Sequence, residues 1–93
     1  MVRPRVTPKA VEFHNRIAAS FRDKYLTDPS FANRLETWRS LIRRHAKPGG
    51  KSMDLGCGPG LMTEALCEIS SVVVAIDGSD AMLDLARART RGR

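Results

Sequence analysis

The chain has 93 residues, of which 42% are hydrophobic, and a net charge of +6. A chain of this length forms at most one domain and buries a modest share of its surface. No apolar run approaches the ~20 residues that a transmembrane helix needs, and the first residues have no stretch that would serve as a secretory signal. We therefore expect a cytoplasmic protein with no membrane segment.

The positive charge is concentrated in the first half of the chain. Residues 1–51 contain twelve Lys and Arg against four Asp and Glu, whereas residues 52–93 contain four against six. A basic half can indicate a nucleic acid or another anionic partner. Charged residues on the polar faces of helices are more often simply solvated, and no basic motif interleaved with aromatic residues is present. We therefore do not expect nucleic acid as a partner.

The two cysteines, Cys57 and Cys67, do not form a metal-binding pattern. A zinc site needs about four ligands, and the two histidines, His14 and His45, fall in a different segment. We expect no metal and two reduced thiols. Cys57 is expected to be a small loop residue and not a nucleophile.

Residues 1–50 are predicted to form a helical cap segment of two amphipathic helices. Thr7 and Pro8 predict the first start, because a hydroxyl caps free N–H groups and proline suits the first turn. Asp28 and Pro29 repeat this signal for the second helix. Apolar residues recur at helical spacing in both segments, and Trp38 is predicted to lie in the core. The stripes are Phe13, Ile17, Phe21 and Tyr25, then Phe31, Leu35, Trp38 and Ile42.

Residues 51–93 are predicted to begin an α/β domain. A strand from about Ser52 to Leu55 leads into a glycine loop and a helix, and a second strand follows over residues 72–76. That second run is apolar throughout, which is typical of a strand buried on both faces of a parallel sheet. Asp80 is predicted to cap the last helix. The predicted fold is a partial Rossmann-like parallel sheet, the first βαβα unit, preceded by two amphipathic helices.

Three glycines follow the first strand at alternate positions: Gly56, Gly58 and Gly60. They allow a sharp turn and close approach to a ligand, and the next helix presents free N–H groups there. Asp77 stands at the end of the second strand, where a carboxylate can accept hydrogen bonds from ribose hydroxyls. These features together predict a ligand that carries a ribose.

Two other nucleotide-binding motifs fit less well. A dinucleotide loop needs its third glycine one residue later, where Leu61 stands. Residues 50–52 resemble the end of a phosphate-binding loop, but His45 occupies the position of the required first glycine, and the triplet precedes a strand. We interpret this triplet as a loop and a strand start.

The stretch Asp54-Leu55-Gly56-Cys57-Gly58-Pro59-Gly60 resembles motif I of class I S-adenosylmethionine-dependent methyltransferases, which has an acid two residues before a G-x-G-x-G loop. Residues 73–87 are similar to the next motif of the family, with its acid at the strand end, a serine two residues on, and Met-Leu and Ala-Arg pairs in the helix. Residues 13–21 also look like the N-terminal helix of many small-molecule methyltransferases.

The resemblance implies S-adenosyl-L-methionine as the cofactor and a set of residues that bind it. Asp54 and the Gly56 and Gly58 backbones would hold the methionine end, within a loop completed by Cys57 and Gly60. Asp77 would bind the ribose hydroxyls, and Gly78 with Met82 would border the adenine. The residues alone also allow simpler roles, in which Asp54 caps the loop and Asp77 is a turn residue.

The resemblance implies a methyltransferase that acts on a small-molecule acceptor, with this chain as its N-terminal fragment. The family's sheet has seven strands, and its acceptor-selecting residues follow the third strand, so no catalytic residue is assigned. We expect the chain alone to be inactive and to associate through its exposed sheet edge. The alternative is a non-catalytic module that binds a nucleoside cofactor or a partner chain.

Overall fold

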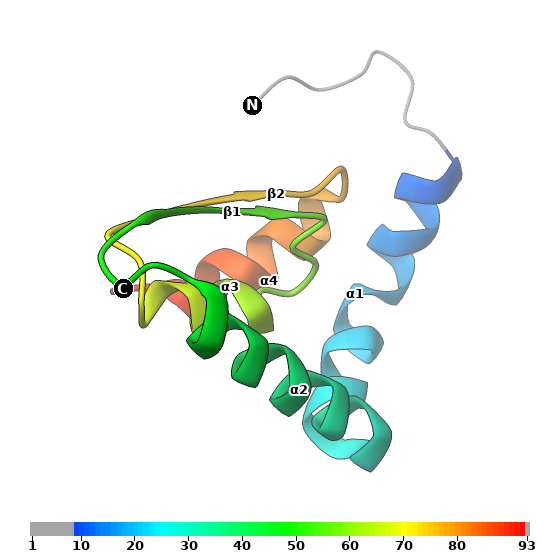
Figure 1. Cartoon of the computed structure of the whole chain (residues 1–93). Coiled ribbons are helices and arrows are strands. Elements are labelled where there is room, and N and C mark those ends of the chain that lie inside the picture. Colours follow the sequence, from blue (N-terminus) through cyan, green and yellow to red (C-terminus); the bar gives the residue numbers. More distant parts are fainter. Residues whose placement is uncertain (1–8, 93) are drawn as a thin grey trace.

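The computed structural model describes residues 9–92, which form four helices and a two-stranded parallel sheet (Figure 1). The predicted α/β class, with two helices before a βαβα unit, is confirmed. The predicted helix start at Thr7 and Pro8 lies outside the described residues. The elements in chain order are α1 (Lys9–Thr27), α2 (Pro29–His45), β1 (Lys51–Leu55), α3 (Leu61–Cys67), β2 (Val72–Ile76) and α4 (Asp80–Thr90).

The two strands pair in parallel along their full length. Lys51 is opposite Val72 and Leu55 is opposite Ile76. The strand β1 begins one residue earlier than predicted, so Gly50 precedes a strand and not a helix. This agrees with our interpretation of residues 50–52 as a loop and a strand start.

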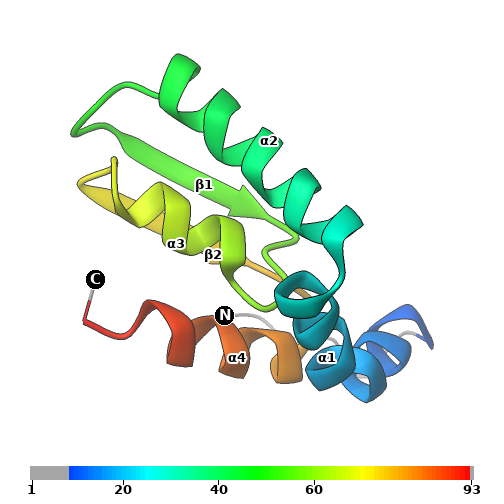
Figure 2. The ribbon, with the colours of Figure 1, turned by 90° about the horizontal axis from the view of Figure 1, so that it is seen from below.

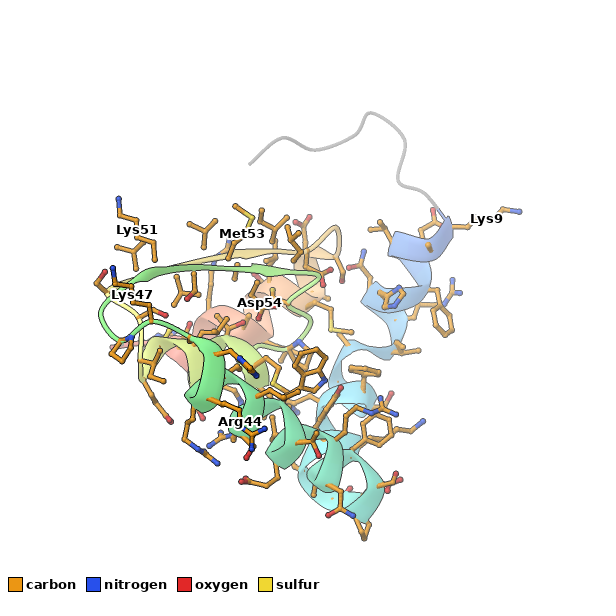
Figure 3. All side chains as sticks on the ribbon, viewed as in Figure 1. Lys9, Arg44, Lys47, Lys51, Met53 and Asp54 are labelled. Atoms are coloured by element: carbon orange, nitrogen blue, oxygen red, sulfur yellow. The ribbon has the colours of Figure 1, made fainter. Side chains whose placement is uncertain are left out.

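The described helices leave one face of the sheet uncovered. In Figures 1 and 2, α2, α3 and α4 all lie on the same side of β1 and β2. Figure 3 shows Lys51 and Met53 on the opposite side, whereas Asp54 points toward the helices. The prediction that β2 is buried on both faces is therefore wrong for the described chain: Val73 and Ala75 are half-buried, and alternate side chains are exposed. The exposed apolar residues of this open face are Met53, Leu55, Val72, Val74 and Ile76.

The core lies between the sheet and α4. Cys57, Leu83 and Ala86 form its buried cluster, and Ala75 of β2 packs against it. The helix α4 is capped by Ser79 and not by Asp80, because the Ser79 hydroxyl accepts a hydrogen bond from the Met82 N–H at 3.2 Å. Asp80 is instead the first residue of the helix.

The helix α2 begins as predicted. The Asp28 carboxylate caps it by accepting hydrogen bonds from the Ser30 hydroxyl at 2.8 Å and the Ser30 N–H at 2.9 Å. These two bonds stabilise the charged form and lower the pKa of Asp28.

The prediction that Trp38 lies in the core is wrong, since its side chain is 52% exposed. The more enclosed positions of α2 include Leu35, Arg39 and Ile42. Arg39 is drawn inward because its guanidinium lies 3.7 Å from the Glu64 carboxylate of α3. Glu64 also pairs with Arg89 of α4 at 3.6 Å, so this carboxylate links three helices.

Candidate functional site

A cavity of 420 Å³ lies where α1 faces the glycine loop, the end of β2 and the start of α4. One wall is made by α1 and the other by residues 56–82, which are distant in sequence. The α1 wall consists of Ala10, Val11, His14 and Phe21. The opposite wall consists of Gly56, Gly58, Ile76, Asp77, Gly78, Ser79 and Met82.

The glycine loop is held to the end of β2 by its own backbone. The N–H groups of Gly56 and Cys57 both donate to the carbonyl oxygen of Ile76, at 2.7 and 2.9 Å. Gly56 and Gly58 have φ angles of 71° and 54°, and a Cβ on either would meet no atom within 4 Å. Glycine is therefore used here for its backbone conformation, and it leaves the loop surface open at the cavity.

Asp77 joins the two halves of the second wall. Its Oδ2 accepts a hydrogen bond from the Gly58 N–H at 2.9 Å, and its Oδ1 accepts one from the Ser79 N–H at 2.8 Å. These bonds fix the orientation of the carboxylate. Each carboxylate oxygen can accept a second hydrogen bond, so Asp77 can still bind a ligand hydroxyl.

Five of the eight residues predicted to bind a cofactor line this cavity: Gly56, Gly58, Asp77, Gly78 and Met82. The other three, Asp54, Cys57 and Gly60, do not line it. Asp54 is half-buried on the helix side of β1 and accepts a hydrogen bond from Thr63. A Cβ on Gly60 would lie 2.7 Å from the Cα of Ala86, so this glycine permits contact with α4.

Cys57 is 7% exposed and belongs to the core. Burial raises the pKa of its thiol to about 11, and the carboxylates of Asp77 and Asp54 add to the effect. A thiol that stays protonated is a poor nucleophile. This agrees with the expectation that Cys57 is a small loop residue.

The α1 wall contains site residues that sequence reasoning did not single out. The Asn15 Oδ1 accepts hydrogen bonds from the Ser79 hydroxyl and from the Ala81 N–H, the latter at 3.3 Å. Val11 Cγ2 would lie 3.1 Å from a Cβ on Gly78. These contacts hold α1 against the start of α4. The resemblance of residues 13–21 to a methyltransferase N-terminal helix was the one available signal.

The structure brings no metal-binding cluster to this site. Within residues 9–92, no group of three or more His, Cys, Asp or Glu side chains is placed to hold a metal ion. In the same range, no helix has both the length and the apolar character to cross a membrane.

The part of the chain that contains the glycine loop and Asp77 is similar to a known protein family. Residues 53–93 match the family described as "Methyltransferase domain". This segment of the chain is therefore similar to a methyltransferase domain. This segment contains the glycine loop, Asp77 and α4, which together form most of the second cavity wall.

Two relatives named "Ubiquinone biosynthesis O-methyltransferase" are similar to part of the chain. The protein of Xanthomonas campestris pv. campestris (strain B100) is 41% identical over 47 residues, 50% of this chain and 20% of the relative. The protein of Coxiella burnetii (strain Dugway 5J108-111) is 29% identical over 70 residues, 75% of this chain and 27% of the relative. The matched part of the chain thus spans between a fifth and about a quarter of these relatives.

Proposed function

We propose that this methyltransferase segment binds S-adenosyl-L-methionine in the cavity between α1 and the glycine loop. It would be the cofactor-binding portion of an enzyme that methylates a small molecule. In this proposal residues 1–50 form a helical cap segment, and residues 51–93 begin the cofactor-binding domain. The observation that carries the proposal is the position of Asp77, whose fixed carboxylate lines the same cavity as Gly56 and Gly58.

The residues of the cavity suit the two parts of an adenosine. The Asp77 carboxylate can accept hydrogen bonds from the ribose hydroxyls, which is the role of an acid at this point of a Rossmann-like sheet. Gly78 and Met82 would border the adenine, with Val11 of α1 opposite Gly78. The thioether of Met82 is polarisable and makes favourable contacts with aromatic rings.

The methionine end of the cofactor would lie at the glycine loop. The cofactor carries a positive sulfonium and an amino group, and the Asp54 carboxylate next to this loop complements that charge. At Gly56 and Gly58, the open space where a side chain would stand leaves room for close approach to the backbone. Cys57 and Gly60 would shape the loop from its buried side, through contact with the core and with Ala86.

When bound, S-adenosyl-L-methionine supplies a methyl group that is already activated for displacement. The protein's task is to orient that group and the acceptor and to exclude water. The name of the relatives specifies transfer to oxygen, which supports an acceptor hydroxyl for the whole enzyme. The two free cysteines are consistent with a reducing compartment, so we place the enzyme in the cytoplasm.

Calorimetric titration of the protein with S-adenosylmethionine, S-adenosylhomocysteine and NAD tests this proposal. We expect both S-adenosyl compounds to bind and NAD to give no heat of binding. Binding of NAD without any response to the S-adenosyl compounds would contradict it.

A further inference from the structure

The Asp54 carboxylate is held by a residue that does not itself reach the cavity. Asp54 is on the helix side of β1, whereas its neighbour Met53 points to the open face (Figure 3). The Thr63 hydroxyl donates a hydrogen bond to the Asp54 Oδ2 at 2.7 Å. Thr63 is the third residue of α3 and is only 4% exposed. The bond therefore connects a buried hydroxyl to a carboxylate beside the glycine loop.

The chemistry of this pair explains why a threonine stands there. Threonine is a weaker helix former than alanine or leucine, and a buried hydroxyl is costly without a partner. Gly60, and not Thr63, is the N-cap of α3. The Thr63 hydroxyl instead donates to the Asp54 carboxylate, and a hydrogen bond to an ionised acceptor is stronger than one to a neutral acceptor.

The Asp54 carboxylate also lacks a cationic partner within residues 9–92, where no Lys or Arg forms an ion pair with it. Thr63 satisfies Oδ2 and supplies no positive charge. A half-buried carboxylate in this state is complemented best by a ligand that carries a cationic amino group.

We propose that Thr63 is a positioning residue of the cofactor site. Its hydroxyl holds Oδ2 and so fixes the rotation of the Asp54 carboxylate, which leaves Oδ1 as the acceptor for the amino group of the cofactor's methionine end. This inference rests on the proposed function, because it assigns Asp54 to that end of S-adenosylmethionine. It adds a residue that does not line the cavity and acts only through Asp54.

Two ligands separate this role from a purely structural one. S-adenosylhomocysteine has the amino-acid end, and methylthioadenosine has the same nucleoside without it. We expect Thr63→Val to weaken binding of S-adenosylhomocysteine about tenfold, the scale of one hydrogen bond to a charged group, and to leave methylthioadenosine binding unchanged. Thr63→Ser should restore most of the lost affinity because it keeps the hydroxyl. Asp54→Asn should also weaken only the first ligand.

Calorimetric titration of these variants gives distinct outcomes. If Asp54→Asn weakens S-adenosylhomocysteine selectively and Thr63→Val does not, the positioning role is wrong and the proposed function stands. Equal weakening of both ligands by Thr63→Val, without rescue by Thr63→Ser, would mean that the bond only joins β1 to α3. If neither ligand binds the unsubstituted protein, the proposed function itself fails. If Thr63→Val does not fold, Thr63→Ala is measured with the same two ligands.

Discussion

The Asp77 carboxylate and the Gly58 N–H are joined by a hydrogen bond of 2.9 Å between the end of β2 and the glycine loop. This bond connects two segments that are 19 residues apart. Together with the hydrogen bond from the Ser79 N–H, it fixes the position of the carboxylate at the cavity. The same residue is thus both part of the loop's structure and the group proposed to recognise ribose.

The close packing of Gly60 against Ala86 leads to a prediction about the stability of the fold. We expect Gly60→Ala to lower the free energy of unfolding by about 2 kcal/mol or more, since it combines overpacking with a positive φ. The φ of Gly60 is 91°, and the added Cβ would lie 2.7 Å from the Ala86 Cα. Urea denaturation followed by circular dichroism measures the change.

Gly49→Ala is the matched control for Gly60→Ala. The φ of Gly49 is 77°, but a Cβ there meets nothing within 4 Å. The control should therefore show only the cost of the backbone conformation. Equal losses from the two variants would mean that close contact between Gly60 and Ala86 does not matter.

The hydrogen bonds of Asn15 predict that this residue stabilises the packing of α1 against the start of α4. Asn15→Ala removes the acceptor for the Ser79 hydroxyl and the Ala81 N–H, so we expect a loss of about 1–2 kcal/mol. The loss should appear as faster amide hydrogen exchange in α1, with less change in β2. Asn33→Ala, on the exposed side of α2, is the control. Unchanged exchange in α1 would contradict the proposed attachment.

The raised pKa of Cys57 predicts that the stability of the protein depends on pH. Its folded pKa of about 11 lies above its ordinary value of 9.0, so the unfolded chain releases the proton first as pH rises. The contribution of Cys57 to stability is therefore fully present below pH 9 and is lost between pH 9 and about 11. Urea denaturation at pH 8 and pH 10.5 should show a smaller decline for Cys57→Ala than for the unsubstituted protein.

Alkylation tests the same thiol independently. Iodoacetamide at pH 8 should label the partly exposed Cys67 well before the buried Cys57, because the thiolate is the reactive form. Peptide mass spectrometry identifies the labelled residue. Labelling of Cys57 at the rate of Cys67 would be inconsistent with its burial.

The open face of the sheet predicts self-association of this 93-residue chain. Val74 is 48% exposed between other exposed apolar residues of both strands, and exposed apolar patches promote association. Each strand also has one edge without a partner among the described residues. We expect Val74→Lys to shift the chain toward monomer in size-exclusion chromatography with light scattering.

Leu26→Lys is the control for this prediction, since Leu26 is 54% exposed on α1 and lies away from the sheet. It should leave the oligomeric state unchanged. A monomeric unsubstituted chain, or equal effects of the two lysines, would rule out association through the open face.

Local patterns were sufficient to predict most elements of the fold. The apolar run of β2 and the alternate glycines after β1 each lie within a short segment of the sequence. Both strands and the loop between β1 and α3 could therefore be located from the sequence. The cap of α4 was misplaced by one residue, because Ser79 and Asp80 are both good capping residues and only the backbone geometry distinguishes them. Trp38 was wrongly predicted to lie in the core, because the sequence does not show that the neighbouring Arg39 turns inward to pair with Glu64.

Contacts between distant segments could not be predicted. Asn15 and Ser79 are 64 residues apart, and no periodicity connects them. The apolar run of β2 wrongly predicted burial on both faces, because the described helices cover only one of them. The role of Thr63 was not predicted, because no sequence motif marks it. Its contact with Asp54 becomes visible only once α3 is placed beside β1.

The comparison of Asp77 with Asp84 tests the central claim most directly. Asp84 is on an exposed side of α4, where it pairs with Arg87 at 3.2 Å, so Asp84→Ala should leave binding unchanged. Calorimetric titration with S-adenosylhomocysteine should show that Asp77→Ala weakens binding by about 1–3 kcal/mol, the scale of lost hydrogen bonds to a charged group. Asp77→Asn should also bind more weakly while disturbing the loop less. Equal affinities for the Asp77→Ala and Asp84→Ala variants would contradict the proposal that this cavity binds the ribose of the cofactor.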